Sequence, residues 1–199
     1  MNLSLISALA IYAFVTSITP GPNNTMLLAS GANYGLRATL PHMFGITFGF
    51  AFMLTAVGLG IGGLFTAFPF TYVVLRYVGA AYMIYLAWNI ATSGSMKEAA
   101  SGVGKPFSFT QAAAFQWINP KAWVLALGVA TTYIPNNGYF LNLLLATVVF
   151  SIVNFPTISV WAGAGQMLRN ILQNGRYLHI FNYAMAALLI ASLYPMFAA

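Results

Sequence analysis

Two short polar segments in an otherwise apolar chain have the residue types to bind a charged solute. The first is Thr-Pro-Gly-Pro-Asn-Asn at residues 19–24, and the second is Gln-Trp-Ile-Asn-Pro-Lys-Ala-Trp at residues 116–123. Proline lacks a backbone N–H and interrupts the helical hydrogen-bond ladder. In a membrane, the carbonyl groups freed in this way are tolerated only where they are buried in protein or line a wet cavity. Both segments are therefore predicted breaks in membrane helices.

We predict that the two breaks are the two halves of one binding site. In the first, freed carbonyls and the Asn amides would receive an ammonium group. In the second, Lys121 would pair with a carboxylate, because a lysine at membrane depth usually faces a cavity. Gln116 would cap freed carbonyls or face the same cavity. The predicted solute-binding residues are Pro20, Gly21, Pro22, Asn23, Asn24, Gln116, Asn119, Pro120 and Lys121.

Each half-site also has a purely structural interpretation. The first break could be a kink that lets neighbouring helices pack. The second could lie near the membrane surface, with Lys121 extended toward lipid head groups.

His42 and Lys121 are the candidates for proton coupling, because no Asp or Glu lies in a hydrophobic segment and histidine titrates near neutral pH. The alternative for His42 is an interfacial side chain hydrogen-bonded to a loop. Thr47, Arg76 and Asn154 are predicted to line the solute pathway. The alternatives are a Thr hydroxyl bonded to its own helix and an Arg76 that anchors its helix at the interface.

Composition places these residues in a membrane protein. Of the 199 residues, 60% are hydrophobic and 4% are charged, whereas soluble domains are about 45–50% apolar and about 25% charged. The chain has no Cys and a single acidic residue, which excludes disulfides, thiolate metal sites and paired-carboxylate catalysis. We therefore expect no enzyme activity, metal or cofactor. The seven basic residues are scattered singly, so nucleic acid is not an expected partner.

Six apolar windows are each long enough to span a bilayer, for which about 20 residues suffice. They are residues 3–33, 40–65, 70–93, 107–134, 139–168 and 177–198. Residues 94–106 are predicted to be a cytoplasmic linker that divides one membrane domain into two three-helix halves, 1–93 and 107–199.

The basic loop residues predict the topology. Alternate loops carry Arg37, Lys97, Lys105, Arg169 and Arg176, whereas the remaining loops and both ends carry no Lys or Arg. Because basic residues collect in cytoplasmic loops, both termini are predicted to lie outside.

The two halves have corresponding features. Pro22 aligns with Pro120 in the first window of each half, and Tyr77 aligns with Tyr183 in the last. Because each half has an odd number of spans, the second half crosses the membrane in the opposite orientation to the first. The predicted fold is an all-α integral membrane protein with six transmembrane helices, arranged as two inverted three-helix repeats with broken helices 1 and 4. Many secondary transporters form a midplane site in this way.

Gly45 and Gly49, spaced as Gly-x-x-x-Gly, predict a close helix contact within the chain or between copies. Six spans are few for a two-half transporter, so a homodimer is a possible assembly.

The polar segments resemble motifs of the LysE/RhtB amino-acid exporters. The resemblance rests on residues 19–24, on Gly-Ala-Ala-Tyr-Met-Ile-Tyr-Leu-Ala-Trp at residues 79–88 and on Asn-Pro-Lys-Ala at residues 119–122, and it covers the whole chain. Residues 19–24 and 87–93 are most similar to the branch that exports cysteine and O-acetylserine. The resemblance implies a multi-pass protein of the bacterial inner membrane that moves small amino acids or their derivatives outward, driven by the proton gradient.

The predicted function is a secondary transporter for small neutral amino acids or derivatives, of the cysteine/O-acetylserine, homoserine/threonine or leucine type. Because no acidic side chain is available inside the membrane to neutralise a second positive charge, a zwitterion fits better than lysine. The expected partners are the amino acid, the proton gradient and membrane lipid. The alternative is an uncoupled facilitator or channel, which would have the same helix breaks.

Overall fold

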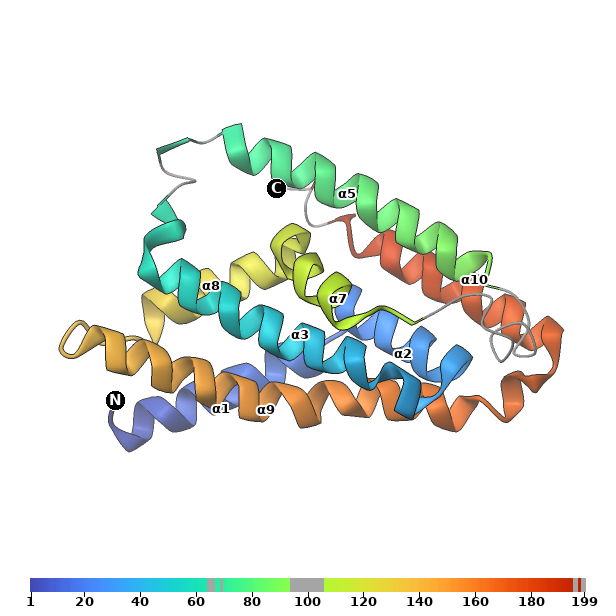
Figure 1. Ribbon diagram of the computed structural model, residues 1–199, viewed down its shortest axis with the longest axis horizontal. Coiled ribbons are helices and arrows are strands. Elements are labelled where there is room, and N and C mark those ends of the chain that lie inside the picture. The colour runs from blue at the N-terminus through green and yellow to red at the C-terminus, as the bar shows by residue number, and fades with distance from the viewer. Residues whose placement is uncertain (64–66, 69, 94–105, 195–196, 198–199) are drawn as a thin grey trace.

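In the computed structural model, residues 1–63, 67–68, 70–93, 106–194 and 197 are described, and their regular elements are all helices. In chain order these are α1 (Leu3–Ile18), α2 (Pro22–Tyr34), α3 (Leu36–Ala56), η1 (Val57–Ile61), α5 (Phe70–Ala91), α7 (Phe109–Phe115), η2 (Gln116–Ile118), α8 (Pro120–Thr132), α9 (Tyr139–Leu168), η3 (Ile171–Gln173) and α10 (Gly175–Ala191). The long helices follow the long axis of the molecule, with α5 beside α10 and α9 beside α1 and α3 (Figure 1).

Within the described residues, two helices are long and apolar enough to cross a membrane by themselves, namely α3 with η1 (Leu36–Ile61) and α9. A third crossing results if α1 and α2 are one span, bent by 57° where they meet. The second window was predicted to begin at residue 40 after a short loop, whereas α3 begins at Leu36. Gly35 alone reverses the chain, because its φ of +86° is open to glycine and strained for other residues.

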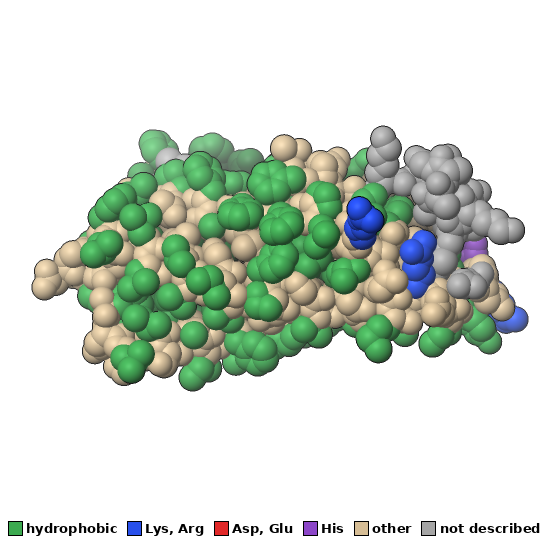
Figure 2. Space-filling view, turned by 60° about the horizontal axis from the view of Figure 1, so that its bottom comes forward, with side chains coloured by type: hydrophobic (Ala, Val, Ile, Leu, Met, Phe, Trp, Pro, Cys, Tyr) green, Lys and Arg blue, Asp and Glu red, His purple; other side chains and the backbone are tan. Residues whose placement is uncertain are grey.

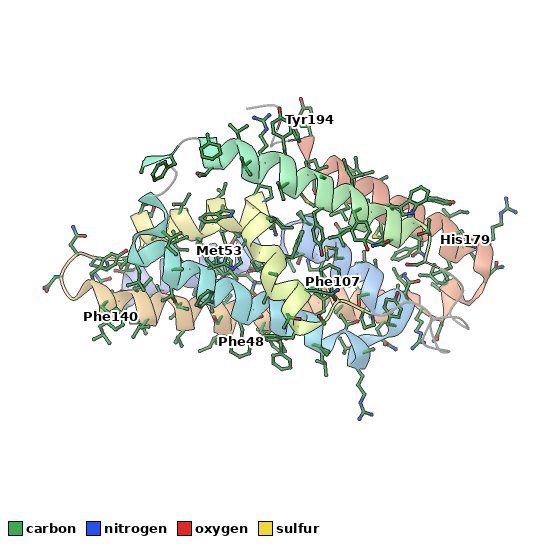
Figure 3. The ribbon with its side chains drawn as sticks, turned by 45° about the horizontal axis from the view of Figure 1, so that its top comes forward. Phe48, Met53, Phe107, Phe140, His179 and Tyr194 are labelled. Carbon is green, nitrogen blue, oxygen red and sulfur yellow. The ribbon has the colours of Figure 1, made fainter. Side chains whose placement is uncertain are left out.

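The outer surface of the bundle is largely apolar, as Figure 2 shows for one face. Phe48 and Phe140 are 57% and 58% exposed, whereas Met53 is fully buried. In Figure 3 the two phenylalanines point away from the bundle and Met53 lies among the helices. Large exposed aromatic side chains of this kind suit contact with lipid hydrocarbon.

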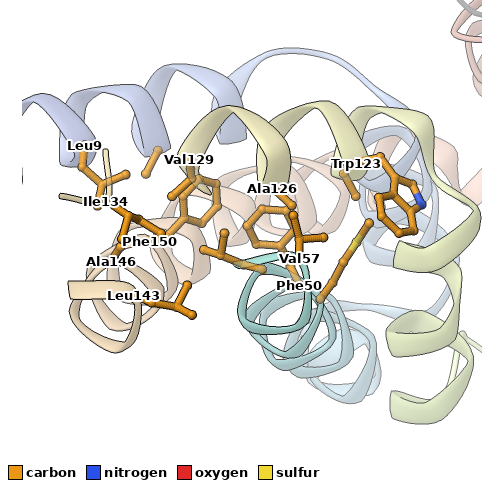
Figure 4. Close-up of a cluster of buried hydrophobic side chains, with 14 residues drawn as sticks. Leu9, Phe50, Val57, Trp123, Ala126, Val129, Ile134, Leu143, Ala146 and Phe150 are labelled. Carbon is orange, nitrogen blue, oxygen red and sulfur yellow. The ribbon is translucent and has the colours of Figure 1, made fainter. Parts of the chain in front are cut away.

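One apolar cluster fixes α1, α3, α8 and α9 relative to one another (Figure 4). Leu9, Phe50, Ala126 and Phe150 lie within it, and the Phe50 and Phe150 ring centroids are 4.6 Å apart. Phe50 and Phe150 also border the candidate site described below, so this cluster supports the side chains around that site.

Several helix crossings are close enough to require glycine, and two of them position α7 and α2. A Cβ atom at Gly45 would lie 2.4 Å from the Phe109 carbonyl oxygen of α7, so the contact predicted for Gly45 forms within the chain. At the crossing of α2 and α9, a Cβ atom at Gly31 would lie 2.1 Å from the Ala162 carbonyl oxygen. These crossings bring α7 against α3 and α2 against α9.

Candidate solute-binding site

Both predicted breaks are interruptions in the helices, and each following helix restarts with a proline. The helix α1 ends at Ile18, and α2 begins with Pro22 as its first residue. After η2, α8 begins with Pro120, and the Asn119 side chain accepts a hydrogen bond from the Lys121 backbone N–H at 3.1 Å. Proline is well suited to a first helical position, where its missing N–H would have no helical partner.

The two breaks meet in space through Lys121. Its Nζ donates hydrogen bonds to the carbonyl oxygen and Oγ1 of Thr19, at 3.0 and 2.9 Å, and to the Pro20 carbonyl oxygen at 3.4 Å. Gly21 leaves room for this contact, because a Cβ atom there would lie 3.0 Å from Lys121 Cδ. Lys121 lies about halfway along the α7–η2–α8 segment, between Ser108, which caps α7, and Tyr133, which follows α8. Its ammonium group is held by the first break and does not extend toward either end of the bundle.

A second pair of side chains joins the breaks. Asn23 Nδ2 donates to Gln116 Oε1 at 2.9 Å, and Gln116 Nε2 donates to Asn23 Oδ1 at 3.3 Å. Gln116 is fully buried, and its Nε2 also donates to the Ala112 carbonyl oxygen at 2.8 Å. Gln116 lines the central cavity, and its carbonyl partner is Ala112 of α7, one turn before the break.

The carbonyl groups at the end of α1 accept further hydrogen bonds. Asn24 Nδ2 donates to the carbonyl oxygens of Ser17 and Thr19, at 2.7 and 2.8 Å, and Trp161 Nε1 donates to that of Ile18 at 3.2 Å. These carbonyls therefore have partners from α2 and α9, as buried backbone groups require.

The predicted pathway residues Thr47 and Asn154 lie beside this break. Thr47 Oγ1 donates to Asn154 Oδ1 at 3.1 Å, and Asn154 Nδ2 donates to Ser17 Oγ at 2.9 Å. The three side chains link α3, α9 and α1, and Thr47 is bonded across helices and not to its own helix.

These groups surround a central cavity of about 40 Å³. A single water needs roughly 10–15 Å³, so in this conformation the cavity has room for a few waters and is too small for an amino acid. Its described lining residues are Thr16, Ser17, Gly21, Asn23, Asn24, Ile46, Phe50, Gln116, Asn119, Lys121, Ala122, Leu125, Phe150, Asn154 and Ile158. The predicted prolines 20, 22 and 120 flank the lining without belonging to it. Of the predicted pathway residues, Asn154 belongs to the lining and Thr47 does not.

Two predicted residues lie elsewhere. His42 lines a separate end cavity, and neither ring nitrogen has a hydrogen-bond partner among the described residues. Arg76 lies on α5, with its Cζ 4.5 Å from the centroid of the Phe197 ring, and it lines neither cavity. Apart from Pro106, the predicted linker 94–106 lies outside the described residues.

Sequence reasoning did not identify Ser17, Thr19 or Trp161 as site residues. The position of Thr19 directly before Pro20 was a usable signal, because it places the Thr19 carbonyl in the break. No comparable local signal marks Trp161, which contacts Ile18 only through the packing of α9 against α1. In the described part of the chain, no group of three His, Cys, Asp or Glu side chains could hold a metal ion.

Comparison with known proteins gives the family. A family profile described as LysE type translocator matches residues 14–192. Two relatives named cysteine/O-acetylserine efflux protein, from Escherichia coli strain K12 and Shigella sonnei strain Ss046, are each 31% identical over 183 residues, covering 90% of this chain and 92% of the relative. No solved structure shows significant similarity to the chain. The chain belongs to the LysE family of translocators.

Proposed function

We propose that the protein is a secondary transporter that exports small neutral amino acids or their derivatives through the bacterial inner membrane. The family and the names of the relatives support export of this solute class. Within it, the candidates are solutes of the cysteine/O-acetylserine, homoserine/threonine and leucine types.

The contact between Lys121 and the first break is the observation that carries the proposal. The Lys121 ammonium lies against three oxygens of Thr19 and Pro20, where the ammonium group of an amino acid would bind equally well. A zwitterion inserted between the breaks would give its carboxylate to Lys121 and its ammonium to those oxygens. Both partners of the existing contact would then be satisfied by one solute molecule.

Charge selects a neutral amino acid in this arrangement. The N-terminal ends of α2 and α8 lie at the breaks, where their dipoles favour a carboxylate. The described lining contains no Asp or Glu, so a second positive charge, as in lysine, would have no counter-charge.

The helix packing supports transport by two inverted halves, 1–93 and 107–199. The first broken helix, α1 with α2, packs against α9, and the second, α7 with α8, packs against α3. The pairs α3 with α9 and α5 with α10 consist of corresponding helices from the two halves. Exchanging the halves therefore leaves this set of contacts the same. We propose six spans with broken helices 1 and 4, and alternating access in which the Asn23–Gln116 pair closes one route.

The two ends of the bundle differ in charge. Arg169 lies beside Gly35 at the end where α2 turns into α3, and Arg37 follows in the first turn of α3. The Met1 amino group donates to Asn142 Oδ1 at 2.6 Å near the start of α9, at the opposite end. The positive-inside rule places the arginine end in the cytoplasm and both termini outside. Figure 2 shows basic side chains at one end of the visible face.

Proton coupling is assigned to Lys121 and His42. Lys121 has three hydrogens to donate only as an ammonium group, so loss of its proton would weaken the contact with Thr19 and Pro20. Proton transfer would thereby be linked to the opening of the central cavity.

The test is counterflow of labelled amino acids into proteoliposomes that contain the purified protein. We expect O-acetylserine, cysteine, homoserine or leucine to accumulate, lysine not to accumulate, and accumulation to collapse with the pH gradient. Equal movement of several solutes, indifferent to the gradient, would instead establish an uncoupled facilitator. No movement of any of these solutes would overturn the proposal.

A further inference from the structure

A second and larger cavity lies at the arginine end of the bundle. Its volume is about 530 Å³, within the range of roughly 300–1,000 Å³ typical of small-molecule sites. The described residues that line this end cavity belong to α2, α3, α5 and α7 and to the non-helical residues 92–93 and 106–108. They include Met26, Asn33, His42, Tyr82, Tyr85 and Asn89.

The end cavity is separate from the central cavity, since the two described linings share no residue. The helix α2 borders both, with Asn23 in the central lining and Met26, about one turn further on, in the end lining. The Asn23–Gln116 pair, described above, lies at this boundary. A solute in the end cavity is therefore one helical turn from the proposed transport site.

His42 is a buried polar residue of this cavity whose ring has no described hydrogen-bond partner. The side chain is 2% exposed, and neither Nδ1 nor Nε2 has a hydrogen-bond partner among the described residues. Two polar side chains of the lining, Asn33 and Ser30, have partners within the protein. Asn33 Nδ2 donates to the Ala29 carbonyl oxygen and to Asn182 Oδ1, at 2.9 and 3.0 Å, and Ser30 shares a hydrogen bond with a threonine of α3.

The surrounding side chains define the chemistry that His42 could bind. A neutral imidazole offers one N–H donor and one acceptor. The described lining contains no Lys or Arg that would favour a phosphate or dicarboxylate, and no Asp or Glu that would favour a cationic solute. The aromatic rings of Tyr82 and Tyr85, with centroids 6.0 Å apart, border the same space, and aromatic faces attract ammonium groups.

We propose that the end cavity is a second binding site for the transported zwitterionic amino acid, with His42 donating a hydrogen bond to its carboxylate. The identity of the solute rests on the proposed function. The ammonium group lies against the tyrosine rings, and the solute passes from this site to the central cavity when the Asn23–Gln116 pair opens. The protein thus loads its solute in two steps from the arginine end.

Because the chain has no cysteine, a single introduced thiol reports on this site without background. Asn89→Cys places a thiol in the lining, and Tyr177→Cys, at a position that is 55% exposed at the start of α10, is the matched control outside it. The full chain in lipid nanodiscs is treated with N-ethylmaleimide, with and without O-acetyl-L-serine, L-homoserine or L-leucine. A solute at about nine times its Kd should slow modification of Asn89→Cys about tenfold and leave Tyr177→Cys unchanged.

Second substitutions distinguish the two sites. Adding His42→Leu should abolish the protection of Asn89→Cys, His42→Gln should restore part of it through its amide N–H, and Lys121→Gln should leave it in place. Protection that survives His42→Leu but is lost with Lys121→Gln would overturn the proposal, because the thiol would then report the central site. If no solute protects the thiol while export persists in proteoliposomes, the end site is wrong and the proposed function stands. If export is also absent, both fail.

A chemical test on His42 in the unsubstituted protein does not require the His42 variants to fold. Diethyl pyrocarbonate modifies imidazoles, and the chain contains two histidines, of which His179 is exposed at the same end. The solute should slow modification of His42 and leave that of His179 unchanged, whereas equal rates with and without solute would contradict the role of His42.

Discussion

The central and end cavities differ in how their polar groups are satisfied. In the central cavity, Lys121 is bonded to Thr19 and Pro20, and Asn23 to Gln116, so the protein itself provides the partners and the space is about 40 Å³. In the end cavity, His42 is buried without a described partner and the space is about 530 Å³. In the central cavity the groups of the protein bind one another, whereas the proposed end site leaves the His42 ring for a solute.

This difference is a consequence of helix geometry. The first break frees carbonyl oxygens at the end of α1, and the second places Lys121 at the start of α8. The ammonium donor and the carbonyl acceptors therefore meet when the two helices pack. The end cavity is lined mainly by α2, α3 and α5, none of which is broken by a segment like residues 19–21, and its buried polar group is the His42 side chain. Variants that remove one partner of a central contact should therefore lower the transport rate and leave solute binding in the end cavity largely unchanged.

The largest effect is expected from Lys121→Gln. A hydrogen bond to a charged group contributes about 1.5–3 kcal/mol, so transport should fall about 10–100-fold. Lys121→Arg, which keeps the charge, is the matched control and should retain part of the activity. Initial rates of counterflow measure both. If Lys121→Gln exported with an unchanged rate and pH dependence, the roles of Lys121 in binding and in proton coupling would be wrong.

The next largest effect is expected on stability, at the crossing of α2 and α9, because α2 borders both cavities. Gly31→Ala would place Cβ 2.1 Å from the Ala162 carbonyl oxygen, and such overpacking costs about 1–3 kcal/mol. Thermal unfolding in detergent should show a lower Tm. Gly163→Ala on α9, where a Cβ meets nothing within 4 Å, should leave the Tm unchanged or raise it. Equal Tm changes for both variants would contradict the close approach of α2 and α9.

A smaller effect should separate the two cavities directly. In Asn23→Ala, Gln116 loses its partner on α2 and keeps its bond to the Ala112 carbonyl oxygen, so the boundary between the cavities should open more often. A thiol at Ser17→Cys, in the central lining, should then react with a soluble maleimide several times faster than it does beside an intact Asn23. Asn137→Ala, in the turn before α9, is a control that leaves the boundary intact. An unchanged rate in Asn23→Ala would mean that this pair does not close the route.

The smallest effect is expected from Thr47→Val. The substitution removes one hydrogen bond to Asn154, which is worth about 0.5–1.5 kcal/mol, so transport should fall only a few-fold. Thr131→Val, whose hydroxyl bonds to the Leu127 carbonyl oxygen within its own helix, should have no effect on transport. The comparison fails if the two variants behave alike.

Much of the helix pattern was predictable, because it depends on local chemistry. The window 139–168 matches α9, and the predicted breaks lie directly before Pro22 and Pro120, where proline suits the first position of a helix. Proline alone does not locate a break, since Pro41 and Pro156 lie inside α3 and α9. The start of α3 was placed too late, because Gly35 makes the reversal in one residue and neighbouring sequence gives no sign of that. The sequence indicated that freed carbonyls at the first break would bind an ammonium group. It did not indicate that the ammonium group would be that of Lys121, bonded to Thr19.

The sequence by itself determined that this is an apolar, nearly acid-free helical protein with two proline-broken segments, and its motifs indicated the family. Only the tertiary structure decided that the two breaks satisfy each other across a small cavity, and that His42 is buried beside a larger one. The physical reason is that backbone interruption is set by residues within one helical turn, whereas cavities and hydrogen-bond partners are set by how helices distant in sequence pack.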